Sequence, residues 1–265
     1  MSTFFRINPE TEMIPDAGIG DFIEGYSQKG ERVNYAILVL FLFPIPGLYF
    51  VIEEFLHYMK TRNIVNSYYL YSGGFIYQRR NGTTILDQDV IDFKKVKGIS
   101  LSHTRLYGQF GMYNNTEVCL QVLNEEMSIV FNQTSSYVNK NEKTGKYNLC
   151  GQAFNAILYR WDKIALERFN HEFADKGYGT FISRNIYYPD EVDMIQVGEN
   201  YIKQNNAYAE TGNSKFLLND GKLQVFTESG NGNDYDKAPL EIDINKMFNS
   251  NVFLIVIRQL LGVEI

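Results

Sequence analysis

The sequence predicts an α+β fold with two antiparallel β-units, each followed by one helix, and an apolar helical hairpin before the first unit. Short segments that alternate apolar and polar residues are separated by glycine-containing turns, which is typical of antiparallel strands. Residues 149–176 carry apolar side chains at helical spacing instead. The order of strands followed by a helix occurs twice, whereas alternating strands and helices would indicate a parallel sheet.

Composition and charge limit the possible classes of protein. The 265 residues carry a formal net charge of -6, and 45% of them are hydrophobic. This apolar content supports a substantial core and excludes a disordered or collagen-like chain. Cys119 and Cys150 are too few for a disulfide framework, and we expect both to be reduced. The acidic balance argues against nucleic acid as a partner, because neutralising phosphates needs a basic surface.

An uncharged apolar run covers residues 34–52. As one helix it would be about 28 Å long, close to the roughly 30 Å hydrocarbon core of a bilayer. A Pro-Ile-Pro-Gly sequence at residues 44–47 interrupts it, because proline removes a backbone donor and restricts the residue before it. The sequence therefore predicts two short apolar arms, 35–43 and 48–58, joined by a turn.

Three interpretations of these arms stay open. A re-entrant or interfacial hairpin would leave both ends on one side of a membrane, as the positive charges on both flanks suggest. A single kinked span is the second interpretation. The third is a buried helical hairpin within a soluble protein or at an oligomer interface. The membrane hairpin would use Leu38, Leu40, Phe41, Phe43, Pro44, Pro46, Gly47, Leu48 and Phe50.

Alternating segments predict the strands of the first unit. Gly73-Gly74 and Asn81-Gly82 are the expected turns, the second of type I′, and Gly98 is the expected bend in a single long strand. A hairpin is expected around residues 124–126. The predicted strands are 67–72, 74–79, 83–87, 90–103, 116–123 and 127–132.

One long helix should close the first unit. Asn148 is a plausible N-cap, and Gly177 is a C′ glycine that ends the helix. A broad apolar face must cover another element, and the preceding sheet is the available partner. The residues of this face are Leu149, Ala153, Phe154, Ile157, Leu158, Trp161, Ile164, Ala165, Phe169 and Phe173.

A second, shorter series of strands and one helix follows. Asp220-Gly221 is a hairpin turn signal, and the last helix is expected over about 245–261, with Gly262 after it. The predicted strands are 180–188, 192–198, 200–204, 215–219, 222–228 and 239–244. The expected domains are a polar segment 1–33, the apolar hairpin 34–62, a first unit 63–177 and a second unit 178–265.

Two segments resemble known proteins. Residues 69–96, YLYSGGFIYQRRNGTTILDQDVIDFKKV, resemble the opening strands of bacterial pleckstrin-homology-like domains. Residues 222–228 and 239–261 resemble the C-terminal end of an uncharacterised bacterial family, a domain of unknown function with an apolar hairpin before its first β-unit. The resemblance covers most of residues 35–262. It implies pleckstrin-homology-like units and brings no known activity.

The usual catalytic and metal-binding patterns are missing from the sequence. The three histidines have no second ligand at metal-site spacing, and no phosphate-binding loop or nucleophile elbow occurs. We therefore expect no catalytic residue, no metal and no cofactor. The acidic residues Asp87, Asp89 and Asp92, and the cluster at 231–236, are expected to be solvated turn residues. Five cations could bind lipid headgroups or other anions, or form a solvated sheet face: Arg79, Arg80, Lys94, Lys95 and Lys97.

These observations favour a non-enzymatic, membrane-associated scaffold or binding protein. Its expected partners are membrane lipid, a protein or a second copy of the chain, and its expected location is a bacterial inner membrane with the bulk in the cytoplasm. A soluble cytoplasmic subunit that uses the apolar hairpin as an interface is one alternative. An enzyme with a site in the polar loops 133–147 or 229–236 is the other.

Overall fold

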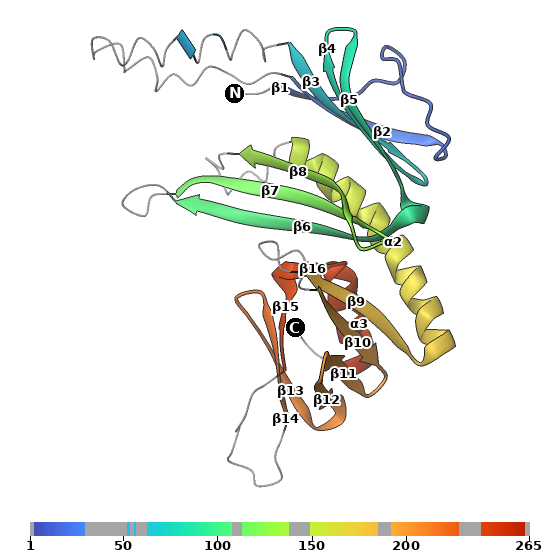
Figure 1. Cartoon of the computed structure of the whole chain (residues 1–265), viewed down its shortest axis with the longest axis vertical. Coiled ribbons are helices and arrows are strands. Elements are labelled where there is room, and N and C mark those ends of the chain that lie inside the picture. Colours follow the sequence, from blue (N-terminus) through green and yellow to red (C-terminus); the bar gives the residue numbers. More distant parts are fainter. Residues whose placement is uncertain are drawn as a thin grey trace, which may run out of the picture. The chain divides into compact units, whose positions relative to one another are not determined.

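The computed structural model describes residues 3–29, 52–53, 56, 63–107, 113–137, 149–184, 192–227 and 240–262. This part of the chain is mostly β: it holds sixteen strands in four sheets and two α-helices (Figure 1). The predicted α+β class is therefore wrong. The strands contain many β-branched and aromatic side chains, which favour a pleated sheet. The predicted apolar hairpin, residues 34–62, lies almost wholly outside the described residues.

The first sheet has five strands that follow one another in space as they do in sequence. Residues 3–29, expected as a polar segment, supply two of them, because β2 pairs with β3 so that Ser27 lies opposite Ser67. The strands are β1 (Thr3–Arg6), β2 (Phe22–Lys29), β3 (Ile64–Tyr71), β4 (Gly74–Asn81) and β5 (Thr84–Asp92). All neighbouring strands of this sheet are antiparallel.

Tyrosines form much of the core of this sheet. Tyr69 and Tyr71 on β3 are buried with Ile76 on β4 and with Ile7 from the segment between β1 and β2. This segment passes over one face of the sheet, and Ile14, Ala17 and Ile19 pack there as well. Tyr68 points to the opposite face, since neighbouring strand residues alternate, and its ring meets Phe154 edge-on at 5.4 Å.

Both predicted turns of the first sheet form hairpins, but each is shifted by one residue. Asn81 pairs with Thr84, so Gly82 and Thr83 are the central residues. Gly82 has φ 60° and Thr83 has no positive φ, which fits a type II′ turn rather than type I′, where both would be positive. Tyr71 pairs with Gly74. Gly74 is required by a close approach, since a Cβ there would lie 2.1 Å from the carbonyl oxygen of Ile91.

The predicted single strand 90–103 is wrong: β5 and β6 are separated by a 3-10 helix, η2 (Phe93–Lys95). The carboxylate of Asp92 accepts a hydrogen bond from the backbone N of Lys94 at 2.9 Å, which nucleates this turn, and the Phe93 side chain is buried. A three-stranded sheet follows, with β6 (Val96–Tyr107), β7 (Tyr113–Asn124) and β8 (Ile129–Tyr137). The predicted hairpin around residues 124–126 is confirmed.

The long helix α2 (Leu149–Lys176) has the predicted limits. Gly177 ends it in the left-handed conformation with φ 75°, and its N–H bonds to the Phe173 carbonyl at 2.8 Å. Six of the ten residues of the predicted face are buried: Ala153, Phe154, Ile157, Trp161, Ala165 and Phe169. Leu158, Ile164 and Phe173 are half-buried.

Two further sheets follow α2. One has the order β12-β11-β10-β9-β16 and the other the order β13-β14-β15. The Asp220-Gly221 turn is confirmed: both residues have positive φ, 49° and 76°, and connect β13 to β14 as the type I′ signal requires. The strands are β9 (Tyr178–Arg184), β10 (Val192–Gly198), β11 (Tyr201–Gln204), β12 (Ala207–Glu210), β13 (Ser214–Asn219), β14 (Lys222–Thr227), β15 (Leu240–Asp243) and β16 (Met247–Phe248).

The last helix, α3 (Ser250–Leu261), begins five residues later than predicted. Residues 244–246 form a 3-10 turn, β16 follows, and Asn249 in the left-handed region reverses the chain into the helix. Gly262 ends the helix as predicted, with φ 62°. The buried face of α3 consists of Val252, Phe253, Val256 and Ile257.

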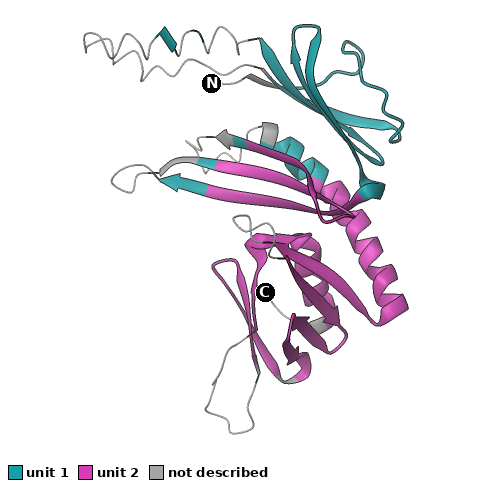
Figure 2. Cartoon of the chain, viewed as in Figure 1, with its two compact units in different colours: residues 1–95, 105–116, 135–157 teal, residues 96–104, 117–134, 158–265 magenta. Residues whose placement is uncertain are grey.

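The chain divides into two compact units, and several segments alternate between them (Figure 2). Unit 1 comprises residues 1–95, 105–116 and 135–157, and unit 2 comprises residues 96–104, 117–134 and 158–265. The expected domain limits at residues 33, 62 and 177 stay a prediction. Within the described ranges, no helix combines the length and the apolar character that a bilayer crossing needs.

Candidate functional site

Unit 2 contains a small pocket against α2. The start of β6, the second half of α2, the start of β9 and the beginning of α3 line it. The volume of this pocket is about 60 Å³. Since one water needs roughly 10–15 Å³ of such space, the pocket suits about four waters or one small polar group. The apolar lining is Trp161, Ala165, Phe169, Phe181 and Val252, and the polar lining is Lys97, Arg168, Glu172, Thr180 and Asn249.

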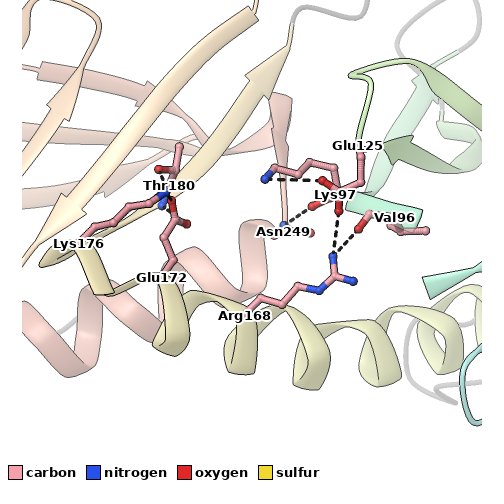
Figure 3. Close-up of polar contacts among 8 residues, drawn as sticks. All are labelled: Val96, Lys97, Glu125, Arg168, Glu172, Lys176, Thr180 and Asn249. Atoms are coloured by element: carbon pink, nitrogen blue, oxygen red, sulfur yellow. Dashed lines mark hydrogen bonds and ion pairs between the residues drawn. The ribbon is translucent and has the colours of Figure 1, made fainter. Parts of the chain in front are cut away.

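Lys97 and Arg168 converge on one carboxylate beside this pocket (Figure 3). Nζ of Lys97 lies 3.9 Å from Oε2 of Glu125, and Nη1 of Arg168 lies 3.4 Å from Oε1 of the same side chain. Glu125 belongs to the β7–β8 turn. The three side chains are 44%, 38% and 52% exposed, so water and salt screen these attractions.

Backbone and ring contacts hold Arg168 in place. Its Nη1 donates a hydrogen bond to the carbonyl of Val96 at 2.6 Å (Figure 3). Its guanidinium carbon lies 5.2 Å from the centre of the Trp161 ring, within cation–π distance. A guanidinium fixed in this way is preorganised to meet a carboxylate or phosphate, because less side-chain freedom is lost on binding.

Asn249 connects three elements at the pocket. Its Oδ1 accepts hydrogen bonds from Nε1 of Trp161 at 2.6 Å and from the backbone N of Ile99 at 3.1 Å. Its Nδ2 donates to the Lys97 carbonyl at 3.3 Å. The backbone has φ 60°, a conformation that asparagine tolerates better than most residues. The side chain therefore places Lys97 and Trp161 together.

The other polar end of the pocket is a carboxylate, Glu172. It accepts hydrogen bonds from N and Oγ1 of Thr180, at 3.1 and 3.0 Å, and from Nζ of Lys176 at 3.1 Å (Figure 3). Burial raises the pKa of Glu172, but the bonds from Lys176 and Thr180 outweigh it, so the net pKa is lowered. This carboxylate is ionised and engaged at neutral pH.

The chemistry of the pocket favours binding of a small anionic group at the Lys97–Arg168 end. Two cations and a ring with a polarisable face lie there, and the chain already places one carboxylate on both cations. In the described part of the chain, no group of three or more His, Cys, Asp or Glu side chains is placed to hold a metal ion.

The predicted cations on β4 both have acidic neighbours. Arg79 lies opposite Asp87 in the β4–β5 register. Nη2 of Arg80 lies 3.9 Å from Glu12 and 3.4 Å from Oγ of Ser67. The anion-binding role of this pair stays a prediction, and the nearby carboxylates would compete with a lipid phosphate for the two guanidinium groups.

The other three predicted cations follow one another closely in sequence. Lys94 and Lys95 are exposed residues of η2 in unit 1, whereas Lys97 belongs to unit 2 and lines the pocket. The nine residues of the predicted membrane hairpin lie outside the described residues, as does the acidic cluster at 231–236. Cys119 lies on β7 as a free thiol, half-buried, and donates to Asn132 Oδ1 at 3.2 Å.

Glu125, Arg168 and Asn249 are not among the site residues that the sequence predicts. The pattern places Arg168 on a helix, four residues before Glu172, and it places Asn249 in a predicted helix that in fact begins after it. One signal was available: Arg168 comes seven residues after the only tryptophan, two helical turns along the same face. Asn249 gave no signal, because its partners at residues 97 and 99 are about 150 positions away.

No protein-family model matches this chain, and no curated protein matches it. The resemblance to a bacterial pleckstrin-homology-like family therefore stays a prediction.

Proposed function

We propose that this chain is a non-enzymatic binding protein that holds an acidic group of a protein partner at the Lys97–Arg168 end of the pocket. The observation that supports this is the convergence of both cations on the Glu125 carboxylate. Glu125 occupies the position that a partner's carboxylate would take. Because it is half exposed and screened, an incoming carboxylate can displace it at low cost.

The state of the ionisable groups supports binding over catalysis. A general acid or base works best with a pKa near neutrality. The pKa of Glu172 is instead lowered, and three donors occupy its oxygens. These groups suit fixed electrostatic recognition.

Trp161 provides a direct test, because it is the only tryptophan in the chain and lines the pocket. A glutamate-rich peptide is titrated into full-length protein while tryptophan fluorescence is recorded, and the same peptide with glutamine in place of glutamate is the control. We expect a saturable change with the first peptide only. Lys97→Gln should weaken binding about threefold to fivefold, as expected for a screened ion pair.

Two further variants sharpen this test. Glu125→Gln should strengthen binding about threefold, since it removes the internal competitor. Lys95→Gln removes the same charge from an exposed residue outside the pocket and should leave the affinity unchanged. Equal affinity for both peptides, or equal losses in Lys97→Gln and Lys95→Gln, would contradict the proposal.

We also propose that residues 34–58 attach the protein to a membrane, in the simplest case a bacterial inner membrane with the bulk in the cytoplasm. The uncharged sequence 34–52 supports this. Full-length protein and a version lacking residues 34–58 are sedimented with vesicles of phosphatidylcholine and phosphatidylglycerol. Sedimentation of the full-length protein alone supports attachment. A full-length protein that is monodisperse and does not sediment with vesicles would support the soluble-subunit alternative.

A further inference from the structure

The edge strand of the first sheet, β5, offers an open side for pairing. It has nine residues and pairs with β4 along one side. Among the described strands, none pairs with its other side. A strand edge presents unpaired N–H and C=O groups and can accept an extended segment of another chain.

Three large apolar side chains of the edge strand β5 are exposed to water. Ile85, Leu86 and Val90 are 53%, 50% and 45% exposed. A register shift between Arg79 and Arg80 of β4 places the irregularity of β5 at Leu86. The regular part of the edge is therefore the stretch from Asp87 to Asp92.

Two carboxylates mark one face of this regular stretch. Asp87 and Asp89 are two residues apart and so share a face. Arg79 lies opposite Asp87, but the residue opposite Asp89 is Tyr77. Burial raises the pKa of Asp89, and the charge of Asp87 raises it further. A cation supplied from the open side would relieve this repulsion.

We propose that β5 accepts an extended segment of a partner protein as an added strand, in which basic residues alternate with apolar ones. The basic side chains would lie beside Asp87 and Asp89, and the apolar ones on the opposite face beside Val90. Backbone hydrogen bonds would supply affinity, and this alternation would supply specificity.

The charges disfavour a second copy of this chain as the occupant. An antiparallel pair of β5 strands centred on Gln88 would place Asp87 of one copy directly opposite Asp89 of the other. Like charges directly opposite each other destabilise a strand pair. The same two carboxylates that attract a basic segment thus oppose edge-to-edge self-association.

The test uses full-length protein and a labelled peptide of nine residues, the length of β5, that alternates lysine and valine. Binding is followed by fluorescence anisotropy. Two other peptides serve as controls: glutamate replaces lysine in one, and alternate backbone nitrogens are methylated in the other. We expect the lysine peptide to bind at least fivefold more tightly than either control, because the controls lack the charge match or the strand donors.

Charge reversal separates this edge from general electrostatics. Asp87→Lys/Asp89→Lys should reverse the preference, so that the glutamate peptide binds more tightly. Glu167→Lys/Asp175→Lys makes the same change in net charge at exposed positions of α2 and should leave the preference as in the original protein. Far-ultraviolet circular dichroism confirms that both variants fold.

Hydrogen exchange locates the bound peptide. The amides of residues 84–92 should become protected when the lysine peptide is added. Equal binding of the methylated peptide, a reversal in the α2 variant, or no new protection at 84–92 would overturn the proposal. Protection at 84–92 that rises with protein concentration alone would overturn it as well, because it would identify a second copy as the occupant.

Discussion

At the scale of single residues, Asn249 connects three of the elements that line the pocket. Its side chain satisfies the indole N–H of the fully buried Trp161 and the backbone N–H of Ile99. A donor left unsatisfied in the interior costs about 1–3 kcal/mol. One amide thus fixes the relative positions of β6, α2 and α3 within unit 2.

Asn249→Ala should lower the free energy of unfolding by about 3 kcal/mol. It leaves these two donors without an acceptor and puts alanine at a position with positive φ, where it is strained. Urea denaturation measures the change. Asn205→Ala is the matched control, since Asn205 also has a positive φ, 51°, but lies in an exposed turn. A loss no larger than that of Asn205→Ala would contradict the role of the amide.

Gly179 permits the stacking of Phe169 on the start of β9. A Cβ at this position would lie 2.1 Å from Cε2 of Phe169, and the ring is buried. Gly179→Ala should therefore cost about 2 kcal/mol through overpacking. In Gly212→Ala the new methyl group meets nothing within 4 Å, so the thermal midpoint should change little. Equal effects of the two substitutions would contradict this explanation.

At the scale of elements, Glu172 ties the end of α2 to β9 through both donors of Thr180. Because its folded pKa lies below the ordinary value of 4.5, it stabilises the fold fully above that value. This stability is lost as pH falls through the folded pKa. Glu172→Gln should cost about 1 kcal/mol at pH 7, allowing for screening, and should flatten the pH dependence below 4.5. Denaturation curves between about pH 3 and 7 measure both effects.

Asp162 on α2 has the opposite effect where it meets α3. Its Oδ2 accepts from Nδ2 of Asn251 at 3.0 Å, while its buried Oδ1 has no hydrogen-bond partner in the described structure. Burial raises its pKa above 3.8, although the Asn251 bond lowers it in part. The ionised form therefore costs stability, and this loss grows as pH rises from 3.8 through the folded pKa.

Asp162→Asn should raise the free energy of unfolding at pH 7 by about 1 kcal/mol, since the neutral amide avoids the cost of a buried charge. Asp175→Asn, at an exposed position of the same helix, should have little effect. Denaturation at pH 7 compares the two. A destabilised Asp162→Asn variant would show that the carboxylate is favourable where it lies.

At the scale of the whole molecule, the net charge of -6 opposes association with nucleic acids. We expect no retention of double-stranded DNA by full-length protein at about 0.15 M salt in a gel-shift experiment. The basic residues of the first sheet have acidic neighbours, such as Asp87 opposite Arg79, which supports this expectation. Binding that falls steeply with added salt would contradict it.

Several local elements of this protein can be predicted from its residues alone. The helix at 149–176 with its terminal Gly177, the Asp220-Gly221 hairpin and the strands around them follow from periodicity and turn chemistry, which act over a few residues.

The folded structure, and no local pattern, shows the predominance of strands, the entry of residues 3–29 into the first sheet and the late start of α3. It also shows that Lys97, Arg168 and Asn249 share one pocket. These features depend on contacts between residues far apart in the chain, and a local pattern does not specify which distant strand or side chain supplies the other half.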